Sequence, residues 1–305
     1  MMRRRFMWIG MVLSFLFSLA PSCPGNPGDP GEARMLPIPA GKFVRGACSE
    51  RSNHGACTPE DLGYDYWADD DNEAPVREIT LDAYSIGETE VTVAAYAACV
   101  EAGACNTPGV GVNCNWGNAN RSDHPINCVS WFDANDYCTW KGQRLPTEAE
   151  WEKAARGGCE IAGDPDTCEP GLDDRRYPWG DEIPDETDPQ NPDCSKANFY
   201  PCERHTAPVG SYPEGISPYG ALDMAGNVAE WVADWYDNTY YMATYPKPDH
   251  SPSTNPQGPE NGRVKVYRGG SWSSSPALNV RATIRGAYMP ESKANVFGFR
   301  CVMDQ

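Results

Sequence analysis

Residues 144–158, "RLPTEAEWEKAARGG", carry the signal that decides the fold. Thr147 and Glu150 have the spacing of a capping box, in which each side chain accepts a hydrogen bond from the backbone N–H of the other at the start of a helix. Gly157 and Gly158 supply the residues that commonly end one. We therefore expect a helix that begins after Thr147. The small and aromatic positions expected to face the core are Ala149, Trp151, Ala154 and Ala155.

Around this helix the chain alternates short helical and short strand patterns with long irregular stretches. Helical apolar spacing predicts further helices over residues 91–103, 130–142 and 220–237. Alternating or β-branched stretches predict strands over residues 34–48, 77–92, 264–272, 281–288 and 298–303. No tandem repeat and no internal linker divides residues 33–305. The pattern predicts one α+β domain that is rich in loops.

The composition agrees with a loop-rich but folded chain. Its 305 residues include 29 glycines and 28 prolines, which favour turns, while 10 tryptophans, 15 tyrosines and 8 phenylalanines can fill a core. The formal net charge is −18. Because an acidic surface repels phosphate backbones, nucleic acid is not expected as a partner.

The N-terminus has the features of an export signal. Arg3, Arg4 and Arg5 precede an uncharged apolar run that is shorter than a membrane span needs, so residues 1–22 are interpreted as a signal peptide. The Ala-Pro-Ser-Cys ending resembles a bacterial lipoprotein signal, with Cys23 as the lipidated residue and residues 23–32 as a flexible tether. We expect an exported lipoprotein of the periplasm or outer membrane that meets the bilayer only through its lipid. Simple secretion is the alternative.

The chain has 13 cysteines, which leaves an even number for disulfides if Cys23 is lipidated. Closeness in sequence suggests five pairs: Cys48/Cys57, Cys99/Cys105, Cys114/Cys128, Cys159/Cys168 and Cys194/Cys202. Cys138 and Cys301 then remain as a long-range pair.

Several motifs occur together in a characteristic order: "LPIPAGKFVRG", "ETEVT", "RLPTEAEWEKAARGG", "YPWGDE", "GNVAEW", "RGGSW" and "GFRC". With this set of motifs, residues 33–305 resemble the formylglycine-generating enzymes of the sulfatase-modifying-factor family. The resemblance implies a single compact α+β domain with little regular structure, related to the C-type lectin fold. It also implies a disulfide between Cys138, in the segment "SWFDANDYCTWKG" that precedes "RLPTEAEWEKAARGG", and Cys301 of "GFRC".

The resemblance implies that the family's oxidase site is missing. Oxidase members bind copper(I) through two cysteines that follow the Gly-Gly-Ser-aromatic motif, as suits a soft ion. Aligned on Ser271 in that motif, the two positions are Ser274 and Asn279, and no cysteine lies between Cys202 and Cys301. We therefore expect no bound copper, and Ser271, Ser274 and Asn279 mark only the family positions. A serine nucleophile needs a nearby base, and the four histidines form no local triad pattern.

The resemblance also implies calcium, an ion that takes six to eight oxygen ligands. The first set of expected ligands comprises the side chains of Asp223 and Glu230 with the carbonyls of Gly226 and Val228. A second site would use the Asn198 side chain and the Phe199 carbonyl. The alternative interpretation is that Asp223 caps a helix and Glu230 pairs with an arginine.

Two classes of function follow. The first is a non-catalytic, lectin-like binding module of the cell envelope, whose loops between Trp272 and Phe297 hold a protein, peptide or small molecule. The second is an enzyme of the same family with different chemistry, similar to relatives that mature a siderophore. A divergent formylglycine-generating oxidase is a further alternative.

Overall fold

The computed structural model describes residues 32–47, 71–73, 77–164, 168, 175–182, 184, 194–238, 240 and 253–305. The expected signal peptide, the lipidation site Cys23, most of the tether and the Cys48/Cys57 pair lie outside the described residues. No helix within the described ranges is long and apolar enough to cross a membrane.

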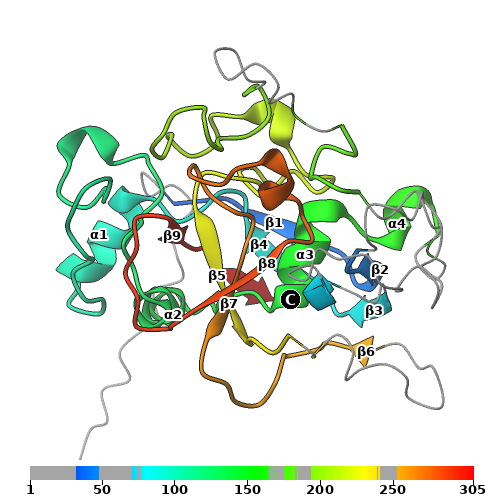
Figure 1. Ribbon diagram of the computed structural model, residues 1–305. Helices are drawn as coiled ribbons and strands as arrows, with labels where there is room; N and C mark the ends of the chain where they lie inside the picture. Colours follow the sequence, from blue (N-terminus) through cyan, green and yellow to red (C-terminus); the bar gives the residue numbers. More distant parts are fainter. Residues whose placement is uncertain are drawn as a thin grey trace, which may run out of the picture.

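Within these ranges the strands form three small sheets (Figure 1). The first has the order β1-β4-β10, with β1 (Met35–Ile38), β4 (Tyr84–Gly87) and β10 (Val302–Asp304) all antiparallel. The second has the order β2-β3-β6, with β2 (Gly41–Arg45), β3 (Arg77–Leu81) and β6 (Ser253–Thr254). The third has the order β8-β7-β5-β9, with β8 (Arg285–Tyr288), β7 (Lys265–Arg268), β5 (Ala229–Trp235) and β9 (Phe297–Gly298).

The helices are α1 (Val93–Glu101), α2 (Trp131–Trp140), α3 (Glu148–Arg156) and α4 (Cys159–Ala162). Short 3-10 turns occur at Asp71–Glu73, Ala119–Arg121, Pro213–Gly215 and Ala277–Val280. The capping box predicted for α3 is present: Thr147 Oγ1 accepts from the N–H of Glu150, and the Glu150 carboxylate accepts from the N–H of Thr147. Ser130 and Asp133 form a second capping box at α2. The sequence therefore located these helix starts correctly.

The helix predicted over residues 220–237 is wrong, because its second half is the strand β5. This strand pairs with β7 on one side and β9 on the other, with Glu230 opposite Arg268 and Ala229 opposite Phe297. Trp231 and Val232 point to opposite faces and enter two different core clusters. Figure 1 shows β5 running through the middle of the molecule, in contact with both α2 and α3. A strand buried on both faces is apolar at nearly every position, so its pattern resembles that of a buried helix.

The helix α3 is buried on all sides, including its charged residues. The sequence predicted that Ala149, Trp151, Ala154 and Ala155 face the core, and all four are buried. It did not predict that Glu148 and Glu152, one turn apart, are buried as well.

Two arginines of the third sheet balance these two carboxylates. Arg268 donates to Glu148 Oε1 at 2.9 Å and to Glu152 Oε2 at 2.6 Å. Arg285 donates to both oxygens of Glu148, at 2.7 and 2.9 Å. Glu152 Oε1 also accepts from the N–H of Gly46, just after β2, at 2.7 Å. The four side chains are at most 3 % exposed, so this ion network joins α3 to two sheets away from solvent.

Five disulfides form among the described cysteines: Cys99–Cys105, Cys114–Cys128, Cys138–Cys301, Cys159–Cys168 and Cys194–Cys202. Each was predicted. The Cys138–Cys301 bridge spans 163 residues of sequence and ties α2 to the segment that precedes β10. Disulfides of this number are typical of proteins that fold in an oxidising environment.

Replacing Arg268 with methionine is expected to destabilise the fold strongly. The substitution removes an arginine partner from each of the two buried carboxylates, so that Glu148 keeps Arg285 and Glu152 keeps Arg156. Breaking buried ion pairs in this way typically costs about 3–5 kcal/mol. Chemical denaturation of the two proteins measures the loss. Arg34→Met is the matched control, because Arg34 pairs with Glu88 through an exposed guanidinium, and it should leave the midpoint nearly unchanged. Equal midpoints for Arg268→Met and the wild type would contradict the role given to the network.

Candidate functional site

Two of the residues expected to bind calcium, Asp223 and Glu230, lie in a buried polar cluster at the third sheet. Glu230 lies on β5, Asp223 lies in the loop before it, and Arg300 lies between β9 and β10. Glu90, between β4 and α1, completes the cluster and is fully buried. Asp223 has a left-handed backbone with φ 57°, a conformation that Asp tolerates better than most residues. Thus three distant parts of the sequence meet at this point: Glu90, residues 223–230 and Arg300.

Glu230 is held by an arginine. Its two oxygens accept from Arg300, Oε2 from Nε at 2.7 Å and Oε1 from Nη2 at 2.7 Å, and Oε2 also accepts from Trp151 Nε1 at 2.8 Å. Arg300 also donates to the carbonyls of Gly87 and Leu222, at 3.0 and 2.9 Å. This is the arginine pairing that the sequence left open as the alternative for Glu230.

Asp223 and Glu90 form the part of the cluster with excess negative charge. Asp223 Oδ2 accepts from the N–H of Gly210 at 2.6 Å. Neither carboxyl oxygen of Glu90 meets a hydrogen-bond donor. Burial raises the pKa of Glu90 well above its usual range, and the neighbouring charge of Asp223 raises it further. Burial also raises the pKa of Asp223, although the Gly210 N–H and Arg300 oppose this. A shared proton or a bound cation would remove the repulsion between the two carboxylates.

The charge of the cluster fits a hard divalent cation, but only some of its carboxylate oxygens are available as ligands. Three carboxylates face one guanidinium, so an ionised cluster has two excess negative charges, which a calcium ion would neutralise. Asp223 and Glu90 have carboxylate oxygens that can act as metal ligands, whereas both carboxylate oxygens of Glu230 accept hydrogen bonds from Arg300. As they stand, no three His, Cys, Asp or Glu side chains in the described ranges converge as ligands of one ion. Calcium at this cluster therefore stays a prediction.

Two further expected ligands, Gly226 and Val228, occupy the turn that leads into β5. Gly226 has φ 78°, and a Cβ there would lie 2.2 Å from the carbonyl oxygen of Asn198, so only glycine fits. Its N–H donates to the carbonyl of Gly269 at 2.8 Å. Val228 is buried beside it. The turn thus packs directly against both the 198 loop and the Gly-Gly-Ser-Trp motif.

The second expected calcium site shows one available oxygen. Asn198 is fully buried, and its Oδ1 has no hydrogen-bond partner, while its Nδ2 donates to the carbonyl of His205 at 2.9 Å. The carbonyl of Phe199 already accepts from the N–H of Cys202 at 2.7 Å. A buried amide oxygen without a donor fits a cation ligand, so Asn198 is the stronger of the two predicted residues.

The positions that correspond to the copper ligands lie side by side around Gly270. A Cβ on Gly270 would lie 2.4 Å from the carbonyl oxygen of Asn279 and 3.0 Å from Ser274 Oγ. Ser274 Oγ accepts from the N–H of Ser271 at 3.0 Å, and the Asn279 side chain donates to the carbonyl of Ser275 at 2.8 Å. The fold brings the two positions together, and they carry a hydroxyl and an amide that bond within their own loop.

Nothing in the described part of the chain activates these serines. Ser271 Oγ lies 3.1 Å from Ser273 Oγ. The two described histidines, His124 and His205, contact Thr206 through Nδ1 instead. Ser271 therefore acts as a hydrogen-bonding residue of the turn.

The loops between Trp272 and Phe297 border an apolar surface. Phe132 and Tyr288 expose 49 % and 50 % of their area and Met289 exposes 41 %. The N–H of Trp131, next to Phe132, donates to the carbonyl of Pro290 at 2.9 Å, which joins the start of α2 to these loops. The side chain of Asn295 donates to the carbonyl of Val112 at 3.1 Å, and Val112 is 85 % exposed. We call Val112, Phe132, Tyr288 and Met289 the apolar face.

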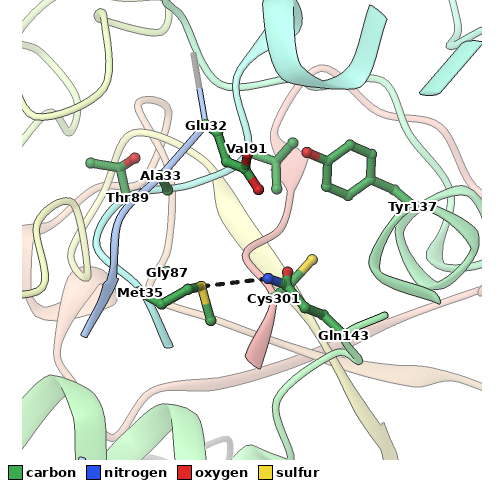
Figure 2. Close-up of a pocket in the computed structure, with 9 residues that line it drawn as sticks. All are labelled: Glu32, Ala33, Met35, Gly87, Thr89, Val91, Tyr137, Gln143 and Cys301. Atoms are coloured by element: carbon green, nitrogen blue, oxygen red, sulfur yellow. Dashed lines mark hydrogen bonds between the residues drawn. The ribbon is translucent and has the colours of Figure 1, made fainter. Parts of the chain in front are cut away.

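A hollow beside the Cys138–Cys301 bridge is too small to be a substrate site. It is lined by residues of the N-terminal segment, the β4–α1 connection and α2, among them Met35, Tyr137 and Cys301 (Figure 2). The side chain of Gln143 donates to Met35 Sδ at 3.7 Å across it. Its volume is about 20 Å³, which suits a water molecule rather than a ligand.

Sequence reasoning missed Glu90. It lies in the quoted motif "ETEVT", where it was interpreted only as part of a strand. A carboxylate directly before the apolar Val91 and a helix start was the one available signal, and it does not distinguish a buried glutamate from an exposed one.

The sequence was compared with protein families and with known proteins. Residues 24–305 match the family described as the sulfatase-modifying factor enzyme 1-like domain. The chain is 40 % identical over 196 residues to a formylglycine-generating enzyme of Streptomyces coelicolor, a match that covers 60 % of this chain and 54 % of that protein. It is 41 % identical over 181 residues to the serine/threonine-protein kinase Pkn1 of Chlamydia trachomatis, covering 59 % of this chain but only 24 % of the kinase. The chain thus spans a quarter to a half of the length of these two relatives.

Among solved structures, the chain is similar to PvdO from Pseudomonas aeruginosa, with a TM-score of 0.63 and 23 % identity over 91 % of this chain and 100 % of that one. At this identity the likeness concerns the fold alone. The predicted α+β domain of the sulfatase-modifying-factor type is therefore confirmed.

If Asp223 binds calcium, saturating calcium should raise the melting temperature of the wild type relative to chelator, because a ligand that binds only the folded state stabilises it. The gain is about 2.7 kcal/mol at a free concentration 100 times the Kd. Asp223→Asn should remove this difference, since it takes away an ionised ligand of similar shape. Glu101→Gln, at an exposed position of α1, is the control and should keep it. If chelator does not change the melting curve of the wild type, the prediction that this cluster binds calcium is wrong.

Proposed function

The chain belongs to the sulfatase-modifying factor enzyme 1-like domain family, and from this premise we propose that it serves as a non-catalytic binding module of the cell envelope. In this proposal the apolar face and the loops between Trp272 and Phe297 hold a protein or peptide ligand. The family's oxidation of cysteine to formylglycine does not take place, because the thiolates that would bind copper(I) are missing.

The apolar face is the observation that carries the proposal. Soluble proteins commonly expose single apolar side chains, but several large ones gathered around one loop system mark an interaction site. Phe132, Tyr288 and Met289 expose about half of their area, and Phe132 packs edge-on against Trp131 at a ring separation of 5.5 Å. Tyr288 packs against Phe297 at 5.4 Å. These rings are therefore held in place before a ligand arrives, which lowers the entropy cost of binding.

The surroundings of Ser274 and Asn279 support the absence of copper chemistry. A hydroxyl and a carboxamide are weak ligands for a soft ion such as copper(I), which prefers sulfur. Both groups are also engaged in hydrogen bonds within their loop. In this proposal the loop is a rigid support for the binding face.

Export agrees with the five disulfides of the described cysteines. We propose that Cys23 is lipidated and that residues 23–32 link the domain to the membrane surface. In this arrangement the apolar face is offered to partners within the envelope.

The purified protein, supplied with copper and a sulfatase peptide that contains the target cysteine, should form no formylglycine. Ser274 and Asn279 cannot replace two thiolates in holding copper(I). Mass spectrometry of the peptide detects the aldehyde, and a copper-loaded formylglycine-generating enzyme is the positive control. Conversion of the peptide by this protein would overturn the proposal in favour of a divergent oxidase.

The binding face can be tested directly with a photo-crosslinking residue. Tyr288→p-benzoylphenylalanine should give a covalent adduct of higher mass when cells that export the protein are irradiated, because the new side chain lies where the ligand is expected. Met303→p-benzoylphenylalanine is the control, since Met303 is similarly exposed but lies on β10. Adducts at both positions alike, or at neither, would count against a ligand on the apolar face.

A further inference from the structure

A second hollow, unrelated to the apolar face, lies beside the first turn of α3. It has a volume of about 380 Å³, within the range of small-ligand sites. Its walls come from the turn after β3, from the residues before and within α3, from the segment after β6, and from the end of β10. Figure 1 shows the end of the chain, α3 and β3 lying together. Neither the proposed binding module nor the calcium sites use this hollow.

The floor of the hollow is buried and the rim is exposed. Leu81, Thr147 and Glu150 form the buried floor, and Asp82 and Gln257 lie on the rim. Apart from Leu81 and Ala83, the described lining residues are all polar or charged. A hollow with so little apolar surface does not suit an apolar ligand, and it has no aromatic ring among these residues on which a base could stack.

The polar groups are fixed in orientation by bonds to one another. The amide of Asn255 and the turn at Asp82 bind reciprocally: Asn255 Oδ1 accepts from the N–H of Asp82 at 2.9 Å, and Asn255 Nδ2 donates to Asp82 Oδ2 at 2.8 Å. Gln257 Nε2 donates to the carbonyl of Asn255 at 3.1 Å. Groups held in this way lose little freedom when a ligand binds.

An anionic ligand does not fit, because Arg144, the one cation among the described lining residues, is already engaged. Arg144 donates to both oxygens of Glu150 at 2.7 and 2.6 Å, and to Asp304 Oδ1 at 3.0 and 2.6 Å. With Asp82, the lining carries three carboxylates against one guanidinium. Phosphates, sulfates and carboxylates would therefore be repelled.

An organic cation fits poorly as well. Of the three carboxylates only Glu150 is buried, and its oxygens already accept from Arg144 and from the N–H of Thr147 at 2.7 Å. Asp82 and Asp304 are exposed to water, where a charge pair contributes little to affinity. What remains is a ligand that is neutral and that both donates and accepts many hydrogen bonds.

We propose that this hollow is a binding site for a neutral polyhydroxyl ligand, a monosaccharide or the end unit of a glycan. Carboxylates and side-chain amides present paired acceptors and donors in one plane, and these match neighbouring hydroxyl groups on a sugar ring. The site needs no metal ion and is separate from both predicted calcium sites. It gives the domain a second attachment point besides the apolar face.

The test uses the side-chain NH₂ resonances of Asn255 and Gln257 in the ¹⁵N-labelled domain as reporters. Glucose, mannose, galactose and N-acetylglucosamine are the probes, each titrated separately. At least one sugar should shift both resonances along a saturable curve. No saturable shift with any of the four, or shifts with putrescine but with no sugar, would overturn the proposal.

Two variants locate the binding. Ala83→Phe should abolish the shift by filling the hollow without removing any of the bonds described, and Ala104→Phe, at an exposed residue after α1, should leave it intact. Gln257→Leu, at an exposed position, should weaken binding, with Asn255 as the remaining reporter, and it does not disturb the core. Unchanged sugar binding in both Ala83→Phe and Gln257→Leu would show that the hollow is not the site.

Discussion

The structure depends on the ion network that buries α3. This helix has Glu148 and Glu152 one turn apart, and both carboxylates are buried. Arg268 of the third sheet binds both of them, and Arg285 of the same sheet binds Glu148. A buried carboxylate without a partner is very costly, so the helix and the sheet must meet in one register. That requirement fixes the position of β7 and β8 relative to α3. It also explains why a chain with so little regular structure has a defined core.

The network continues into the predicted calcium region. Trp151, on the same helix, donates to Glu230 of β5, and Glu230 binds Arg300 near the end of the chain. Two hydrogen-bonded steps thus link helix α3 to Arg300, whose positive charge acts on Glu90 and Asp223. Excess negative charge remains at those two carboxylates, so the stability of this part of the interior depends on a proton or a cation.

The interior of the domain stabilises the fold, and the surface forms the proposed binding sites. Disulfides and buried ion pairs hold the loops, so that the apolar face and the rim of the polar hollow beside α3 can be formed by exposed residues that contribute little to the core. This division lets one fold carry different surfaces in different relatives. The positions of Ser274 and Asn279 illustrate it, because their loop keeps its shape by internal hydrogen bonds although it has no thiols.

The sequence by itself determined the elements whose signals are local. The capping box at Thr147 and the helical spacing that begins at Ser130 located two helix starts, and the close cysteine pairs and the Cys138–Cys301 bridge were correct wherever they are described. The family motifs indicated the fold class, and they identified Ser274 and Asn279 as the two positions that correspond to the copper ligands. Tertiary structure alone decided that β5 is a strand, because a segment buried on both faces has no periodicity of its own. It also decided that Glu90 is buried beside Asp223, that Glu230 binds Arg300, and that a polar hollow lies beside α3. Each of these depends on residues far apart in the sequence, whose meeting is set by packing and charge pairing rather than by any local pattern.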